Sequence, residues 1–150
     1  MRHAVWIVVA VAGLAGRPVS LEAQRLWQAD LQVRSLDVTI LNGNLIARIV
    51  LVSEAYDEAR AARVEVLMPV GVGIVRMGAG CTASAAPPGV SALRGRVTCE
   101  LGNVPVGGSR EVFVITTVPP TGVPKTFGVF AMSDTPDPHP GNNFLERTLP

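Results

Sequence analysis

Hydrophobic and polar residues alternate along most of the chain from residue 29 onward. Leu31 and Val33 are separated by a polar residue, and Leu36 and Val38 continue the alternation in the opposite phase. A period of two places alternate side chains on one face of a β-strand, so these positions predict a half-buried strand. The change of phase at Ser35 predicts a β-bulge or a strand that passes from one sheet to another.

Turn-forming residues divide the rest of the chain into short strands. Asn42-Gly43-Asn44 is a hairpin turn signal, and the strand that follows, residues 45–52, is apolar on both faces, which is typical of a central strand. Further strands are predicted at residues 64–68, 74–77, 97–101, 112–118, 127–131 and 144–149. Seven or eight short strands separated by turn signals predict an all-β protein, an antiparallel β-sandwich.

One segment, residues 53–63, does not follow this pattern. It is rich in helix-forming residues, with acidic side chains near its start and arginines near its end. That order of charges suits the dipole of a helical turn. We expect a solvated connector here, either a short helix in a connecting loop or an acidic loop at one end of the sandwich.

Residues 1–23 have the features of a secretory signal peptide. Arg2 and His3 give a short positive start, and residues 4–16 form an uncharged apolar run. That run is shorter than the roughly 20 apolar residues that span a bilayer, so export fits better than an uncleaved anchor. We expect a signal-peptide helix over residues 1–23 and a mature domain over residues 24–150 with no membrane span.

Composition and charge exclude two classes of protein. The chain is 48% hydrophobic and 17% charged, which is unlike a disordered tail. Thirteen Lys and Arg residues against twelve Asp and Glu residues give a net charge of +1, so the chain lacks the basic surface that nucleic acid requires. We therefore expect no nucleic-acid partner.

The two cysteines, Cys81 and Cys99, are predicted to form a structural disulfide. An even number of cysteines in an exported chain favours a disulfide, and the residues lack both a zinc ligand set and a redox-active CxxC spacing. The intervening segment contains Pro87 and Pro88, so we expect it to lie outside the sheets. A crosslink that closes a loop of this size stabilises a fold by roughly 3 kcal/mol.

The loop 134–143 is the one polar cluster with metal-binding potential. Asp134, Asp137 and the amides of Asn142 and Asn143 offer oxygen ligands of the kind that Ca²⁺ prefers. Asp and Asn also cap tight turns without any metal, and prolines in the loop favour that role. We expect no metal or other cofactor, with a calcium-stabilised adhesion domain as the alternative.

Catalytic chemistry has little support in the sequence. The mature chain has one histidine, His139, which lies between two prolines, and one group of acids, Glu54, Asp57 and Glu58. We expect no catalytic residues and therefore no enzyme. The remaining alternative is a small secreted hydrolase, which requires His139 or these acids to line a pocket.

The aromatic residues divide into two groups. The four phenylalanines lie on predicted strands, so we expect them in the core rather than on a binding surface: Phe113, Phe127, Phe130 and Phe144. Trp27 precedes the first strand, and Tyr56 lies in the predicted connector. Each is a candidate to pack over a sheet edge or to anchor a partner.

Several short motifs, taken in order, resemble a bacterial surface repeat, the family named domain of unknown function eleven. They are residues 29–31 (ADL), 68–72 (MPVGV), 81–84 (CTAS), 97–102 (VTCELG), 104–109 (VPVGGS), 112–119, 133–138 (SDTPDP) and 141–143 (GNN). The resemblance covers residues 29–149. The chain departs from the family where Ser53-Glu54-Ala55-Tyr56 replaces an Asn-Asn-Gly-Pro turn, where residues 85–96 look longer than usual, and in having a single copy.

The resemblance implies an immunoglobulin-like sandwich and a structural, spacer or adhesive role without catalytic residues. We therefore predict an exported, non-catalytic immunoglobulin-like module for protein interaction, adhesion or envelope assembly, located in the periplasm, at the cell surface or outside the cell. Its expected partner is another envelope protein or surface component, bound through loops or an exposed strand edge. The sequence does not indicate an oligomeric state.

Overall fold

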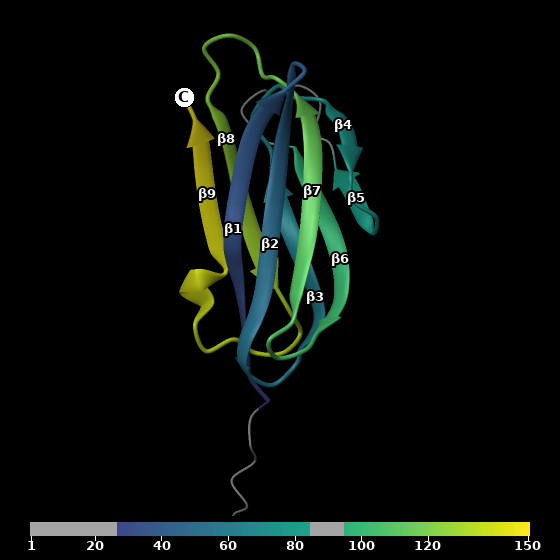
Figure 1. The fold of residues 1–150 in the computed structure, drawn as a ribbon, viewed down its shortest axis with the longest axis vertical. Coiled ribbons are helices and arrows are strands. Elements are labelled where there is room, and N and C mark those ends of the chain that lie inside the picture. Colours follow the sequence, from purple (N-terminus) through teal and green to yellow (C-terminus); the bar gives the residue numbers. More distant parts are fainter. Residues whose placement is uncertain (1–26, 85–94) are drawn as a thin grey trace, which may run out of the picture.

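The computed structural model describes residues 27–84 and 95–150, and these residues form two antiparallel β-sheets packed face to face (Figure 1). The four-stranded sheet has the order β1 (Ala29–Leu41), β2 (Asn44–Tyr56), β7 (Ser109–Thr117) and β4 (Ile74–Met77). The five-stranded sheet has the order β5 (Cys81–Ser84), β6 (Arg96–Val104), β3 (Ala59–Leu67), β8 (Lys125–Met132) and β9 (Phe144–Leu149). The predicted all-β sandwich is confirmed, and the predicted signal peptide lies outside the described residues.

The first hairpin follows from its sequence. Strands β1 and β2 pair up to Leu41 and Asn44, and Asn42 and Gly43 between them have φ angles of 51° and 74°. Two left-handed residues make the turn whose twist matches that of the strands it joins. The register shifts between Val33 and Ser35, so the phase change in the sequence is a β-bulge within one strand.

The core lies between the two sheets and is made by the alternating side chains of the longer strands. Strand β2 is central, as predicted, because it pairs with β1 on one side and β7 on the other. Its inward side chains, Leu45, Ala47, Ile49 and Leu51, are fully buried.

Within the described chain, no helix is long and apolar enough to cross a bilayer.

The prediction that residues 53–63 form a solvated connector is wrong. Strand β2 continues to Tyr56 and β3 begins at Ala59, so the segment carries the chain from one sheet to the other with a two-residue link. Ala59 and Ala62 are fully buried, and Tyr56 and Ala61 have left-handed φ angles that redirect the chain. Strand pairing and the burial of small side chains outweigh local helix propensity here.

The structure has nine strands in its described residues, and the strand that the sequence did not predict is β5 (Cys81–Ser84). It is a short edge strand with exposed side chains, so it lacks the apolar alternation that identifies a half-buried strand. Cys81 therefore belongs to a sheet rather than to a loop. Residues 85–94, with Pro87 and Pro88, lie outside the described residues.

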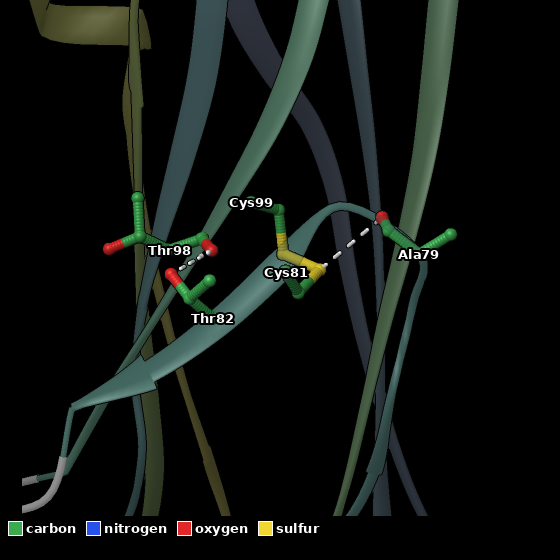
Figure 2. Close-up of a disulfide and its surroundings, with 5 residues drawn as sticks. All are labelled: Ala79, Cys81, Thr82, Thr98 and Cys99. Atoms are coloured by element: carbon green, nitrogen blue, oxygen red, sulfur yellow. Dashed lines mark hydrogen bonds between the residues drawn. A yellow bond between two sulfur atoms is a disulfide. The ribbon is translucent and has the colours of Figure 1, made fainter.

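The disulfide connects this edge strand to its neighbour. Cys81 and Cys99 are opposite each other in the β5–β6 pair, and their sulfur atoms are bonded at 2.05 Å (Figure 2). Cys99 is fully buried and belongs to the core, whereas Cys81 packs against the core from the edge. The next pair along the ladder, Thr82 and Thr98, adds a hydrogen bond of 3.5 Å from Thr82 Oγ1 to the Thr98 carbonyl (Figure 2).

Candidate functional site

The outer face of the five-stranded sheet carries an exposed aromatic pair. On β8, Phe127 and Val129 point inward and are fully buried, whereas Phe130 is 38% exposed. Phe144 on β9 is opposite Phe130 in the register and is 43% exposed. Their ring centroids lie 4.5 Å apart with the rings tilted by 31°, so the two phenylalanines form one continuous apolar surface.

A hollow of about 560 Å³ borders this pair. Strands β3, β6 and β8 and the segment around the short 3-10 helix η1 (Pro140–Asn142) form its walls. Its lining residues are Glu65, Leu67, Arg96, Phe130, Ala131, Met132, Pro140 and Asn143. Most of this lining is apolar, with a carboxylate, a guanidinium and an amide among it, a composition suited to binding.

Gly128 makes room for the aromatic pair. It lies on β8 opposite Leu67 of β3 and Glu146 of β9. A Cβ atom at this position would lie 3.6 Å from Phe144 Cε2 and 3.7 Å from Leu67 Cβ and Cδ1. The Phe144 ring therefore occupies space that a larger side chain at position 128 would fill, and a cross-strand aromatic beside a glycine is a known device for sheet stability.

The charged side chains around the hollow are paired with one another. Arg96 Nη1 lies 3.4 Å from Glu65 Oε2, and Arg63 Nη1 lies 3.5 Å from Asp134 Oδ1. Each pair is partly exposed, so each contributes little to stability. Glu65 and Arg96 thus neutralise each other at the hollow itself, where apolar contact is the main means of attraction.

The expectation that all four phenylalanines belong to the core is confirmed for Phe127 and wrong for Phe113, Phe130 and Phe144. Phe127 is fully buried, and Phe113 is half-buried on the outer face of the other sheet, with Arg76 Cζ 5.9 Å from its ring centroid. The exposure of Phe130 could have been predicted from the sequence. Residues 127, 129 and 131 point inward, so Phe130, which lies between two of them, must point outward. Strand pairing then places Phe144 beside it.

Trp27 and Tyr56 are both exposed near one end of the sandwich. The guanidinium carbon of Arg60 lies 4.7 Å from the centroid of the Trp27 ring, within the range of a cation–π contact. The Tyr56 ring centroid lies 6.4 Å from that of His139. The expectation that either residue anchors a partner stays a prediction.

The structure groups the polar residues of loop 134–143 differently from the sequence expectation. Asp134 forms an ion pair with Arg63, whereas Asp137 lies with His139 and with Asp30 of β1. In the described part of the chain, Asp134 is not among the residues of this group. Asp134 is therefore paired with Arg63 while Asp137 has Asp30 and His139 beside it, and Asp30 is a neighbour that no local pattern could predict. The calcium alternative stays a prediction.

The acids of residues 54–58 do not converge on one site. Glu54 forms an ion pair with Arg34 and lines a separate hollow of about 440 Å³. Asp57 Oδ2 accepts a hydrogen bond from the backbone N–H of Gln28, and Glu58 Oε1 accepts one from Asn103 Nδ2 at 2.8 Å. Each acid thus has its own partner, which gives no support to the alternative of a hydrolase.

Comparison with known proteins identifies the class of fold. No family model and no curated protein matches the chain. An uncharacterised protein from Nocardia farcinica with an immunoglobulin-like fold is similar in structure, with a TM-score of 0.51 and 15% identity over 77% of this chain and 96% of that chain. This likeness establishes an immunoglobulin-like β-sandwich, and it supports the surface-repeat resemblance at the level of fold.

Two chitin-binding domains show a weaker likeness. One belongs to a chitinase from Pyrococcus furiosus, with a TM-score of 0.44 and 12% identity over 73% of this chain and 97% of that chain. The other comes from Streptomyces coelicolor, with a TM-score of 0.45 and 10% identity over 74% of this chain and 95% of that chain.

Proposed function

We propose that this chain is an exported, non-catalytic immunoglobulin-like module that binds another component of the cell envelope through the outer face of its five-stranded sheet. Two features support export: the predicted signal peptide at residues 1–23 and the Cys81–Cys99 disulfide, since such bonds persist in oxidising compartments. The periplasm, the cell surface and the medium all fit this proposal.

The exposed Phe130–Phe144 pair is the observation that carries the proposed binding role. Phe130, Phe144, Met132 and Leu67 place an apolar strip on a sheet face that is otherwise polar. Aromatic residues, methionine and arginine are enriched at protein interfaces, and buried aromatic anchors supply much of the binding energy. This composition favours a protein partner with an apolar patch.

The paired charges indicate how such a partner would be recognised. Glu65 and Arg96 neutralise each other at the edge of the hollow. Binding would then depend on apolar burial and shape more than on long-range charge, so salt should weaken it little.

A double substitution, Phe130→Ala with Phe144→Ala, tests this proposal. Removal of both rings should weaken binding to isolated envelope fractions by tenfold or more. Loss of the cross-strand pair should also lower the melting temperature by a few degrees, so binding is compared at a temperature where the variant is folded. Phe113→Ala is the matched control, because Phe113 lies on the outer face of the other sheet. Retained binding in the double variant, or an equal loss with Phe113→Ala, would contradict the proposal.

A polysaccharide ligand is the second candidate. The open hollow combines the Phe130 ring, which packs on Phe144, with the hydrogen-bonding side chains of Glu65, Arg96 and Asn143. Sugar rings present both C–H faces and hydroxyl groups. Envelope treated with protease separates the two candidates. Binding that survives protease and extends to chitin, cellulose or peptidoglycan identifies a polysaccharide, and binding that protease abolishes identifies a protein.

A further inference from the structure

Three side chains distant in sequence meet at the junction of β1 and loop 134–143. Asp30 comes from β1, and Asp137 and His139 come from the loop that connects β8 to β9. One ligand atom from each residue lies within 4.8 Å of the other two. None of the three lines the hollow of the aromatic face, although Asn143 contacts both the hollow and Asp137.

The group is close to the geometry of a metal site. A tetrahedral ion with bonds of about 2.0–2.2 Å holds its ligand atoms roughly 3.3–3.6 Å apart. His139 Nδ1 and Asp30 Oδ2 are already 3.3 Å apart. An oxygen of Asp137 lies within 4.8 Å of a ligand atom from each of these residues and is the third candidate ligand.

Neighbouring donors orient both carboxylates. Asn142 Nδ2 donates to Asp30 Oδ1 at 2.8 Å, which leaves Asp30 Oδ2 facing the imidazole. Asp137 Oδ1 accepts from the His139 backbone N–H at 2.7 Å, and Asp137 Oδ2 accepts from the Leu31 N–H at 2.9 Å. Outer hydrogen bonds of this kind fix the orientation of metal ligands in proteins.

The two asparagines add an independent observation. The Oδ1 atoms of Asn142 and Asn143 are buried, and neither finds a hydrogen-bond partner among residues 27–84 and 95–150. Both amides already contact the cluster through their nitrogens, Asn142 at Asp30 and Asn143 at Asp137. A buried acceptor without a donor is costly, and a hydrated cation supplies donors through its bound water.

We propose that Asp30, Asp137 and His139 form a binding site for a divalent transition-metal ion, with Zn²⁺ as its representative. The imidazole decides the class of metal, since nitrogen ligands suit zinc and its neighbours whereas calcium takes oxygen ligands. Three protein ligands leave at least one coordination position for water. The His139 side chain is 57% exposed, so solvent reaches the group.

The site would crosslink the start of the first strand to the last connection of the chain. The short helix η1 lies beside β1 (Figure 1). The backbone already joins β1 to this loop through a hydrogen bond from the Ala29 N–H to the Pro136 carbonyl. An ion bound by Asp30 and His139 would strengthen this junction, so metal binding should raise the melting temperature.

Calorimetric titration of the purified protein with Zn²⁺ tests the site, after removal of any polyhistidine tag and dialysis against chelator. We expect one ion per chain and a melting temperature several degrees higher at saturation. His139→Ala and Asp30→Asn should each weaken zinc binding by about 100-fold or more. Asp137 is left intact, because its carboxylate also holds the backbone of Leu31.

Asp134→Asn is the matched control, because Asp134 is an aspartate of the same loop that lies outside the group. It should bind zinc like the unaltered protein, and Co²⁺ should give a visible absorption spectrum that His139→Ala abolishes. The absence of saturable zinc binding, or binding unchanged in both His139→Ala and Asp30→Asn, would overturn the proposal. Calcium binding that survives His139→Ala would also overturn it, in favour of an oxygen-only site.

Discussion

At the scale of single residues, the buried hydroxyl groups have different roles according to their partners. Thr116 is fully buried on β7, and its Oγ1 has no hydrogen-bond partner in the described part of the chain. Thr126 is also buried, but its Oγ1 lies 2.8 Å from that of Thr148 on the neighbouring strand. The same residue type therefore lowers stability in one sheet and supports pairing in the other.

Thr116→Val should raise the free energy of unfolding by about 1 kcal/mol, because valine has the same shape and leaves no buried polar atom unsatisfied. Thr126→Val is the matched control and should lower it by a similar amount, since Thr148 would lose its partner. Urea denaturation measures the free energy of unfolding of both variants. A loss of stability with Thr116→Val would show that its hydroxyl has a partner in solution.

At the scale of elements, the disulfide holds β5 in place. Strand β5 pairs with β6 alone, whereas the β1–β2 hairpin is much longer and carries core side chains. The crosslink at Cys81 and Cys99 therefore matters most for the edge of the five-stranded sheet.

Replacing Cys81 and Cys99 with alanine should lower the free energy of unfolding by about 3 kcal/mol. Hydrogen exchange locates the effect: the amides of β5 should lose protection, and those of the β1–β2 hairpin should change only as far as global stability falls. Equal protection of β5 in the variant would mean that strand pairing alone holds it.

Elements with a strong local pattern could be predicted from the sequence, and those decided by distant contacts could not. The bulge at Ser35 and the turn at Asn42-Gly43 follow from neighbouring residues. Strand β5 is defined by its pairing with β6 rather than by buried side chains, and the β2–β3 crossover depends on the pairing of β3 with β6 and β8. Propensity and alternation were therefore misleading at both places. Likewise, no local signal joins Asp30 to His139, because only the packing of β1 against the last loop brings them together.

At the scale of the whole molecule, the predicted signal peptide at residues 1–23 would decide the compartment of the domain. If residues 1–23 are a cleaved signal peptide, the exported protein should have the intact mass of residues 24–150 with the disulfide formed. Deletion of residues 2–23 should retain the protein in the cytoplasm, where the cysteines stay reduced. Mass spectrometry of the exported and retained fractions checks both expectations, and an uncleaved chain in the membrane fraction would indicate an anchor instead.

The position of β9 has a mechanical consequence. It is an edge strand, hydrogen-bonded to β8 alone, and it carries one ring of the Phe130–Phe144 pair. A pulling force applied at Leu149 would open the β8–β9 ladder one pair at a time, from the Lys125 end toward Phe130. Because the Phe130–Phe144 pair lies at the far end of this ladder, the two rings would separate last, after Leu149 and Leu145 have left the edge of the core. A partner bound at the proposed aromatic face would therefore keep both rings together until β9 has almost completely detached.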